Sequence, residues 1–346
     1  MTGPRQATPR FLVTGATGFI GRRLVPRLIA EFGPSSVTCL VKTPASEAES
    51  SALARYESDG IAVLPGDLLQ SPVGPTPAPF DVVFHLAANI DTDADEEALR
   101  VNHVGTGHLL EWLGPASRPL RIVYASSIAV HDRDRRPTGP ISETSPFVPR
   151  TLYGRTKLEG ERILQAGSAR LGYTWTILRL PTVYGHGQKA DGLFDKFRRL
   201  AETGEAMARI DWPGRTSVIH VDDVAAVMVE FALRDDTAGE IYCVAADEAP
   251  TVGELARRIA AAIGRPIRAV SIPGPVVAAL QAIVWNRLLA ALVPRFARLS
   301  FWRLSLVISD GFWFDTAKFR GARTKAPRNL DEGLVDTLIS GSASTS

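Results

Sequence analysis

Cysteine is scarce in this chain of 346 residues, which contains only Cys39 and Cys243. Two thiols are too few for a disulfide framework or a cysteine-based zinc site, so we expect a cytoplasmic protein. An excess of charge of one sign is also missing. The chain has 39 Lys and Arg residues and 37 Asp and Glu residues, which gives a formal charge of +2. This balance gives no electrostatic reason to expect nucleic acid as a partner.

Long hydrophobic runs are absent as well. Residues 1–10 are polar and lack the apolar core of a signal peptide. The most hydrophobic stretch, 276–293, contains Asn286 and Arg287, whereas a spanning helix needs about 20 apolar residues with few charges. We therefore expect no transmembrane segment. Peripheral membrane contact by residues 276–304 stays an alternative, with a polar edge formed by Arg287, Arg295, Arg298 and Arg303.

Apolar runs typical of buried strands alternate with helical patterns in the first half of the chain. The strand-like runs lie at 10–14, 37–41, 61–64, 81–86, 120–126 and 173–180. The helical patterns between them lie at 19–32, 46–59, 94–112 and 153–171. This alternation predicts an α/β fold with a doubly wound, Rossmann-like parallel sheet that is covered by helices on both faces.

The alternation loosens beyond Gly185. Helical patterns follow at 192–203, 221–233 and 251–263, interrupted by Pro and Gly turns. We expect a dinucleotide-binding domain at 8–180, with a returning segment at about 214–245. A smaller, discontinuous substrate-binding lobe is expected mainly at 181–338, and a disordered polar tail at 339–346.

Three glycines follow the first strand and open the first helix. Gly15 permits a tight turn, Gly18 lets the backbone approach a pyrophosphate, and Gly21 allows close helix–strand packing. The N-terminus of the helix supplies free N–H groups and the positive end of its dipole to the phosphates. A glycine triplet alone could be a simple turn, but the strand–turn–helix context favours a dinucleotide site.

The end of the second strand indicates which dinucleotide binds. An acidic residue there would bind the ribose of NAD, but the sequence has Lys42 after Leu40 and Val41. A missing carboxylate and a nearby cation favour a 2′-phosphate, so we expect NADP(H) rather than NAD(H), with Arg22 or Arg23 as helpers. The alternative is an exposed lysine at a strand end.

Tyr153 and Lys157 are four residues apart in a helical pattern and so lie on one face. An ammonium group near a phenol stabilises the phenolate, which brings the pKa of a tyrosine from about 10 toward the working range of a proton donor. The strand that ends in Ser126 and Ser127 supplies a hydroxyl that can hydrogen-bond the same substrate oxygen.

Several ordered motifs now identify a family. From Arg10 to about Leu338 the chain resembles the extended short-chain dehydrogenase/reductases, the epimerase/dehydratase group. The matching segments are 14–21, 66–68, 85–88, 101–106, 126–127, 153–157, 180–185, 220–224, 315–318 and 330–334. The resemblance implies that Tyr153 is the general acid/base, that Lys157 holds the nicotinamide ribose and tunes Tyr153, and that Ser127 orients the reacting oxygen.

The resemblance also implies a cofactor site. Asp67 would meet the adenine, Leu86 to Ala88 would line the groove, and Pro181 and Thr182 would border the nicotinamide. Motifs and resemblance together predict these cofactor-binding residues: Gly15, Thr17, Gly18, Phe19, Ile20, Gly21, Lys42, Asp67, Leu68, Leu86, Ala87, Ala88, Tyr153, Lys157, Pro181, Thr182 and Val183. We expect no metal, because His85, His103 and His220 lie on separate elements without ligand spacing.

Three positions bear on the substrate. Nucleotide-sugar members of the family usually carry Asn where this chain has Thr182, and an Arg-Asp pair where it has Thr216 and Ser217. Sugar dehydratases carry an acid where it has Ile128. In this respect the chain looks more like the 3β-hydroxysteroid dehydrogenase and dihydroflavonol reductase branches, which act on bulky, largely apolar alcohols and ketones.

Apolar residues in the last third of the chain would suit such a substrate. Alternatively they form the core of the small lobe or a homodimer face. They are Val276, Leu280, Ile283, Val284, Trp285, Leu288, Phe301, Trp302, Trp313 and Phe314.

We therefore expect an NADP(H)-dependent ketoreductase or dehydrogenase that acts on a bulky, largely apolar small-molecule carbonyl or alcohol. Two alternatives remain open because one fold hosts many reactions. The first is a nucleotide-sugar 4-epimerase or 4-reductase. The second is a catalytically silent NADP-binding regulatory protein.

Overall fold

Strands β1 to β6 and β10 form one seven-stranded sheet in the computed structural model of the chain. The structure describes residues 8–70, 79–131, 139–188, 192–286, 304, 306–310 and 312–342. The chain divides into two compact units. The first comprises residues 1–130, 149–179 and 221–242, and the second comprises residues 131–148, 180–220 and 243–346. These units differ from the expected domains mainly at residues 131–148, which belong to the second unit.

The sheet belongs to the first unit and has the order β10-β6-β5-β4-β1-β2-β3. The pairs β1–β2, β1–β4, β2–β3 and β4–β5 are parallel, so the expected doubly wound α/β fold is confirmed. Its strands are β1 Phe11–Thr14, β2 Val37–Val41, β3 Ala62–Pro65, β4 Val82–His85, β5 Arg121–Ser127, β6 Thr174–Leu180 and β10 Glu240–Cys243. The sequence did not indicate β10, which is short and lies at the edge.

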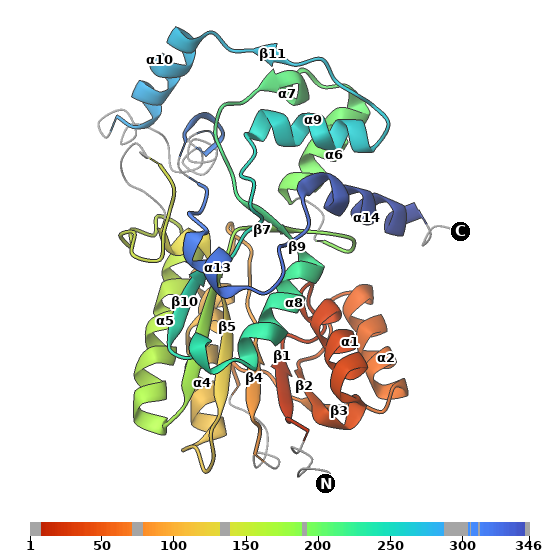
Figure 1. Cartoon of the computed structure of the whole chain (residues 1–346), viewed down its shortest axis with the longest axis vertical. Helices are drawn as coiled ribbons and strands as arrows, with labels where there is room; N and C mark the ends of the chain where they lie inside the picture. Colours follow the sequence, from red (N-terminus) through yellow and green to blue (C-terminus); the bar gives the residue numbers. More distant parts are fainter. Residues whose placement is uncertain are drawn as a thin grey trace. The chain divides into compact units, whose positions relative to one another are not determined.

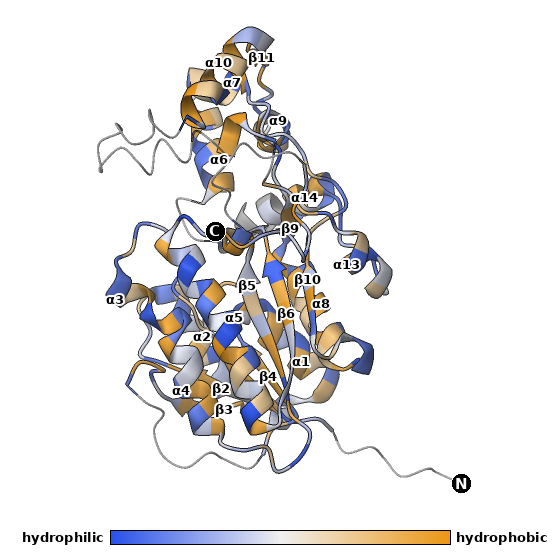
Figure 2. Ribbon diagram, turned by 90° about the vertical axis from the view of Figure 1, so that its left-hand side faces the viewer, coloured by the Kyte–Doolittle hydropathy of each residue, from blue (hydrophilic) through white to orange (hydrophobic). Residues whose placement is uncertain are grey.

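Helices cover this sheet on both faces, with α1 and α8 on one side and α4 and α5 on the other (Figure 1). The helices of this unit are α1 Gly21–Phe32, α2 Glu47–Ser58, α3 Glu96–Leu99, α4 Val104–Leu113, α5 Leu152–Leu171 and α8 Val221–Ala232. Figure 2 shows that the central strands are mostly hydrophobic, whereas the helices combine both kinds of residue. This pattern follows from a sheet buried on both faces.

The expected helix at 94–112 is wrong in one respect, because it is interrupted. Helix α3 ends at Leu99, a 3₁₀ turn follows at Arg100–Asn102, and α4 begins at Val104. The side chain of Asn102 makes hydrogen bonds to Asn89 in the loop after β4. A residue whose side chain binds a neighbouring loop in this way is held at a break between helices rather than within one.

The second unit has its own core. Its elements are β7 Thr182–Tyr184, α6 Leu193–Thr203, α7 Ala206–Arg209, β8 Ile210–Asp211, β9 Val218–His220, α9 Val252–Ala262, β11 Val270–Ser271, α10 Gly274–Val284, α13 Ala317–Ala322 and α14 Leu330–Ser342. Strands β7 and β9 pair in parallel, as do β8 and β11. Helix α9 begins with a capping box between Thr251 and Glu254. Helix α14 continues to Ser342, into the expected polar tail.

The apolar residues at 276–314 do not act as one group. Val284 and Phe314 are buried, and Leu280 and Trp285 pack against the core of the second unit. Val276 and Ile283 are each 47% exposed. The core alternative therefore accounts for several of these residues. Leu288, Phe301, Trp302 and the arginines expected at a membrane edge, Arg287, Arg295, Arg298 and Arg303, lie outside the described residues.

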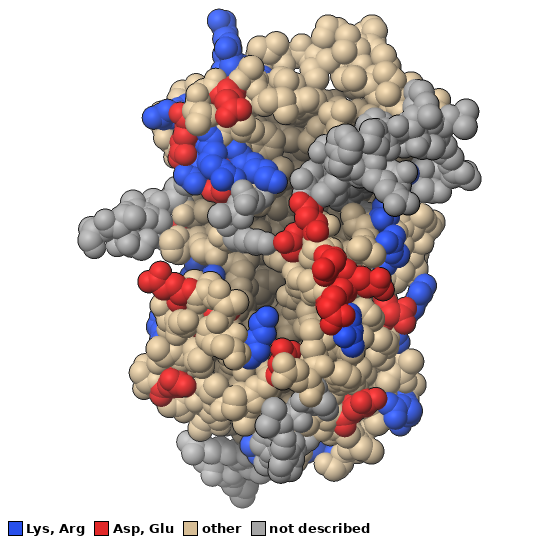
Figure 3. Space-filling view, turned by 180° about the vertical axis from the view of Figure 1, so that it is seen from behind, with Lys and Arg blue, Asp and Glu red and all other residues tan. Residues whose placement is uncertain are grey.

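The part of the chain that the structure describes contains no helix long and apolar enough to cross a membrane. Over the same part, no cluster of three or more His, Cys, Asp or Glu side chains could hold a metal ion. On the face shown in Figure 3, described basic and acidic side chains lie in small groups of both signs. The expectation that the chain does not bind nucleic acid stays a prediction.

Candidate active site

The glycine-rich turn between β1 and α1 brings two backbone segments very close together. Gly15 has φ +68°, and a Cβ atom there would lie 2.7 Å from the Ala87 nitrogen and 2.8 Å from the Leu86 carbonyl carbon. A Cβ on Gly21 would lie 2.4 Å from the Ala16 oxygen. Both positions therefore require glycine on steric grounds. Gly15 lets the turn pack directly against the backbone after β4, as the glycine-rich turn of a dinucleotide site does.

The first turn of α1 is open to an anion. No side chain among the described residues caps this helix, and its first turn carries no acidic residue. The amide of Gly18 donates to the Gly15 carbonyl at 3.0 Å, which closes the turn just before the helix begins. Uncapped N–H groups and the positive end of the helix dipole favour phosphate at this position.

His85 joins the ends of β1 and β4 to α4. Its Nδ1 lies 2.8 Å from the Thr14 hydroxyl, and its Nε2 lies 3.0 Å from the Thr106 hydroxyl. Burial, with a smaller contribution from Lys157, lowers the pKa of His85 to about 3. The Thr14 hydroxyl also accepts from the Ala87 amide at 3.2 Å. His85 is therefore a neutral side chain that holds the start of the expected cofactor groove in place.

Asn102 braces the continuation of this groove. Its Oδ1 accepts from the Asn89 amide at 2.8 Å, and its Nδ2 donates to the Asn89 carbonyl at 2.9 Å. The same Nδ2 donates to the Thr156 hydroxyl at 3.0 Å. Asn102 thus connects the loop after β4 to helix α5, which carries Tyr153. The sequence predicted one unbroken helix across Asn102, so this role is visible only in the structure.

Ser127 and Tyr153 meet at the carboxyl end of β5. The Ser127 hydroxyl accepts from the Ala129 amide at 3.2 Å and makes a side-chain hydrogen bond with Tyr153. A Cβ atom on Gly154 would lie only 2.4 Å from the Ala129 carbonyl oxygen. A side chain at Gly154 would therefore push α5 away from the turn after β5. The structure thus brings together two of the three expected catalytic residues through a glycine that the sequence analysis left without a role.

The pKa of Tyr153 departs from its expected direction. We expected Lys157 to lower it, but burial raises the pKa of the phenol, and only the hydrogen bond with Ser127 opposes this. Burial therefore opposes the lowering that a proton donor needs, and in this structure the phenol keeps its proton.

Lys157 lies one turn beyond Tyr153 and is only 2% exposed. Its Nζ is 4.3 Å from the centre of the Tyr124 ring. Burial lowers the pKa of Lys157 to about 7, and the carboxylate of Glu161 opposes this shift. The lysine therefore titrates near neutral pH in this structure.

Glu161 and Arg179 form a buried ion pair next to this group. Arg179 donates to the two carboxylate oxygens of Glu161 at 3.0 and 2.8 Å, and the Ser126 hydroxyl donates to Glu161 at 2.5 Å. The sequence did not predict this pair. Two signals could have pointed to it: Glu161 follows Lys157 by four residues, and Arg179 interrupts an otherwise apolar strand.

The remaining cofactor residues are spread over both units. Lys42 follows β2 and is exposed. Asp67 accepts from the Leu69 amide at 2.9 Å, while the Leu68 side chain is buried in the core and its carbonyl accepts from His108 at 2.6 Å. These contacts give Leu68 a packing role, and its cofactor contact stays a prediction. So do the contacts of three residues of the second unit: Pro181, Thr182 and Val183.

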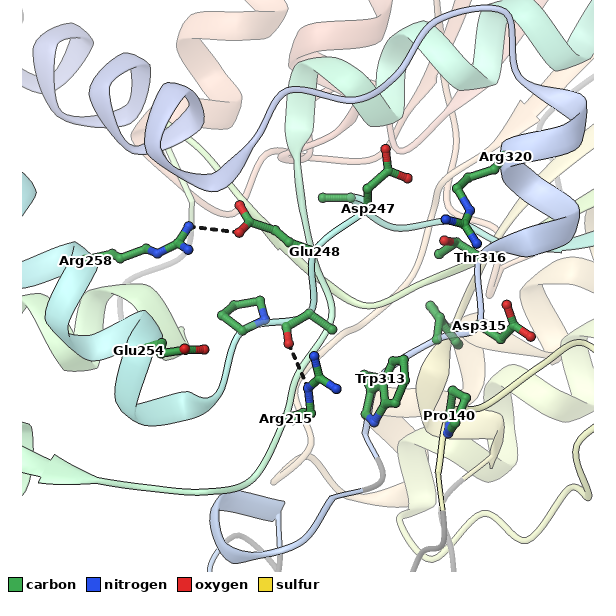
Figure 4. A pocket seen from close by; sticks show the side chains of 14 residues that line it. Pro140, Arg215, Asp247, Glu248, Glu254, Arg258, Trp313, Asp315, Thr316 and Arg320 are labelled. Atoms are coloured by element: carbon green, nitrogen blue, oxygen red, sulfur yellow. Dashed lines mark hydrogen bonds and ion pairs between the residues drawn. The ribbon is translucent and has the colours of Figure 1, made fainter. Parts of the chain in front are cut away.

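The second unit contains a cavity of about 560 Å³ (Figure 4). The guanidinium of Arg215 lies 4.7 Å from the centre of the Trp313 ring, and Arg258 pairs with Glu248 at 2.9 Å. No expected catalytic or cofactor-binding residue lines this cavity. Its lining carries charges of both signs, so it favours no ligand class.

Comparisons with known proteins bear on the family and the fold. The model of the NAD dependent epimerase/dehydratase family matches residues 11–245. A dTDP-6-deoxy-L-talose 4-dehydrogenase (NAD(P)(+)) from Kitasatospora kifunensis is 29% identical over 80% of this chain and 86% of its own. A dTDP-glucose 4,6-dehydratase from Mycolicibacterium smegmatis is 31% identical over 69% of this chain and 72% of its own.

Among solved structures, a UDP-glucuronic acid 4-epimerase from Bacillus cereus in complex with NAD has the same fold. Its TM-score is 0.73 at 19% identity, over 97% of this chain and 100% of that one. These three proteins are nucleotide-sugar enzymes by name. The narrower resemblance to 3β-hydroxysteroid dehydrogenases and dihydroflavonol reductases finds no support in them.

Proposed function

Because the chain belongs to the NAD-dependent epimerase/dehydratase family, we propose that it interconverts a secondary alcohol and a ketone with NAD(P). The observation that carries this proposal is the pair of hydrogen-bonded hydroxyls at the end of β5, Ser127 and Tyr153, with Lys157 one turn further along α5. Two hydroxyls can bind one substrate oxygen, and a phenol there can exchange its proton.

The residues of the first unit fit a nicotinamide dinucleotide. The glycine-rich turn at Gly15 and the uncapped start of α1 suit its pyrophosphate. When bound, the cofactor supplies or accepts a hydride. Tyr153 donates a proton to the substrate oxygen during reduction and removes it during oxidation. Ser127 hydrogen-bonds the same oxygen, and Lys157 places a positive charge beside the reacting groups.

We propose a nucleotide sugar as the substrate, with reaction at a ring hydroxyl or ketone as in a 4-dehydrogenase, 4-reductase or 4-epimerase. The names of the relatives support this choice, because a talose 4-dehydrogenase and a glucose 4,6-dehydratase both carry dTDP-sugars in their names. This support is sequence similarity over most of both chains. Against it, Thr182, Thr216 and Ser217 differ from the residues that nucleotide-sugar members of the family usually carry.

Those departures favour a second candidate, a bulky and largely apolar ketone or alcohol. Thr182 lies at the start of β7, and Thr216 and Ser217 precede β9. The Ser217 hydroxyl accepts from the amide of Phe314 at 2.9 Å and is buried, so it serves the fold of the second unit. Where nucleotide-sugar members have an Arg-Asp pair, this chain has two hydroxyl residues. It therefore lacks the charge-assisted contact that such an arginine makes with a diphosphate.

Ligand binding distinguishes the two substrates. With NAD(P) present, we expect UDP-glucose or dTDP-glucose to raise the melting temperature, since a ligand at 100 times its Kd adds about 2.7 kcal/mol to stability. Reduced cofactor or a C4 epimer should then appear by absorbance or NMR. No response to either sugar, together with NADPH consumption on hydrophobic ketones, would establish the second candidate. Cofactor binding without turnover on either panel would leave a regulatory protein.

Lys42 provides a test of cofactor choice. We propose NADP(H) in preference to NAD(H), although the solved relative described above holds NAD. Lys42 is exposed directly after β2, where a 2′-phosphate would lie. Lys42→Ala should weaken NADP binding about tenfold and leave NAD binding unchanged, because a charge-assisted contact contributes roughly 1.5–3 kcal/mol.

Isothermal titration with both cofactors measures this difference. Lys196→Ala, at an exposed lysine of α6 in the second unit, is the matched control. Equal Kd values of the Lys42→Ala variant and the unaltered chain for NADP would show that Lys42 is only a solvated strand-end residue.

A further inference from the structure

Glu161 lies at the centre of a buried charged cluster in the first unit. Its side chain is 3% exposed and that of Arg179 is fully buried. Helix α5 places Tyr153, Lys157 and Glu161 at intervals of four residues, hence along one face. The cluster therefore contains one anion and two cations, Lys157 and Arg179, shielded from water.

Groups from three elements lie near Lys157, and Arg179 is linked to them through Glu161. Beside it stand His85 on β4, which is held neutral by burial, and Tyr124 on β5, whose ring lies 4.3 Å from Nζ. Tyr153 and Glu161 lie on its own helix, and Arg179 lies on β6. Glu161 is the only carboxylate among these groups. A buried ammonium loses hydration, so an anion near it decides whether it stays charged.

The partners of Glu161 fix its position. Arg179 contacts both carboxylate oxygens at 2.8 and 3.0 Å, and Ser126 at the end of β5 donates to one of them at 2.5 Å. A bidentate guanidinium contact and a hydroxyl donor both hold the carboxylate in one orientation. The carboxylate is thus a fixed negative charge one helical turn beyond Lys157.

We propose that Glu161, held by Arg179 and Ser126, is a positioning residue that keeps the Lys157 ammonium protonated. The inference rests on the proposed function, in which Lys157 places its positive charge beside the reacting groups. With the Glu161 carboxylate nearby, Lys157 keeps its proton up to a higher pH than it would without that carboxylate. Arg179 opposes this effect, since its guanidinium neutralises part of the field of the carboxylate that it binds.

The direction of the Lys157 pKa shift in two variants distinguishes this role from that of a purely structural ion pair. Glu161→Gln removes the anion and leaves two buried cations, so the pKa of Lys157 should fall. Arg179→Met removes the cation that neutralises the Glu161 carboxylate, so the full negative charge acts on Lys157 and the pKa of Lys157 should rise. A pair that only stabilises the fold would lower stability in both variants without moving the lysine in opposite directions.

The test is an NMR titration of the full chain labelled with [¹³Cε]lysine, whose chemical shift reports amine protonation. The Lys157 signal is assigned by its loss in Lys157→Arg. The titration midpoint of Lys157 starts at about 7. Glu161→Gln should lower this midpoint by at least about one pH unit, and Arg179→Met should raise it. Glu159→Gln is the control, because Glu159 lies on the same helix in an exposed pair with Arg162 at 3.5 Å. It should leave the midpoint unchanged.

Shifts in the same direction, or no shift in either variant, would overturn the inference. Should Glu161→Gln not fold, Arg179→Met decides alone, because the Glu161 carboxylate keeps Ser126 as a partner in that variant. A rise of the Lys157 pKa supports the inference, and a fall or no change overturns it. The titration needs no substrate and no turnover. It therefore separates a failure of this inference from a failure of the proposed reaction.

Discussion

Tyr153→Phe should lower kcat by about 10²–10⁴-fold, the usual contribution of a positioned proton donor, and leave cofactor binding intact. The substitution removes only the phenolic oxygen, which hydrogen-bonds Ser127. Helix α5 keeps its Thr151 cap and its Gly154 contact, so the backbone around the site should not move. Steady-state kinetics and a fluorescence titration with NADH and NADPH measure the two quantities separately.

Tyr173→Phe is the matched control for this variant. Tyr173 is also buried and also donates its hydroxyl, to the Gly114 carbonyl, but it precedes β6 and has no role in the proposed reaction. We expect its kcat to match that of the unaltered chain. Full activity of Tyr153→Phe would refute the assignment of Tyr153 as the acid/base. Loss of cofactor binding in that variant would show that the site had collapsed.

Gly15→Ala should have the largest effect on stability and should abolish dinucleotide binding. The added Cβ would lie within 3 Å of backbone atoms of Leu86 and Ala87, which cannot rotate away. The residue would also have to adopt φ +68°. Strain and overpacking together should cost about 2–5 kcal/mol. Urea unfolding gives the free energy, and calorimetry with NAD(P) gives the binding.

Gly204→Ala separates the two causes. Gly204 ends α6 in the left-handed region at φ 71° and ψ 22°, and a Cβ there would meet nothing within 4 Å. It should cost only the conformational strain, about 1–2 kcal/mol, and leave NAD(P) binding unchanged. A Gly15→Ala chain that is no less stable than Gly204→Ala, or that binds the cofactor normally, would contradict the close approach at Gly15.

Much of the site could be predicted because its motifs are local. The spacing of Gly15, Gly18 and Gly21 after an apolar strand encodes a turn whose geometry depends on consecutive residues. The four-residue spacing of Tyr153 and Lys157 places both on one helix face for the same reason. The alternation of strand and helical patterns likewise predicted the doubly wound sheet, because each element buries its own apolar face.

The errors concern residues whose partners are distant in the chain. Asn102 breaks a helical pattern because its side chain binds Asn89 and Thr156. Val284 looked like part of a substrate wall, but it is buried and packs in the core of the second unit, whereas Trp313 and Phe314 line the cavity there. A side chain's hydropathy does not reveal whether it packs in a core or lines a pocket, because both environments exclude water.

The sequence by itself determined the fold class, the family and the identity of the candidate acid/base, since these depend on local spacing and on the order of motifs. Only the tertiary structure decided the pKa shifts and ion pairs of the site. Burial raises the pKa of Tyr153 and lowers that of Lys157, and Glu161 meets Arg179 across 18 residues of chain. Desolvation and buried ion pairs arise from segments that only folding brings together, and no local pattern encodes them.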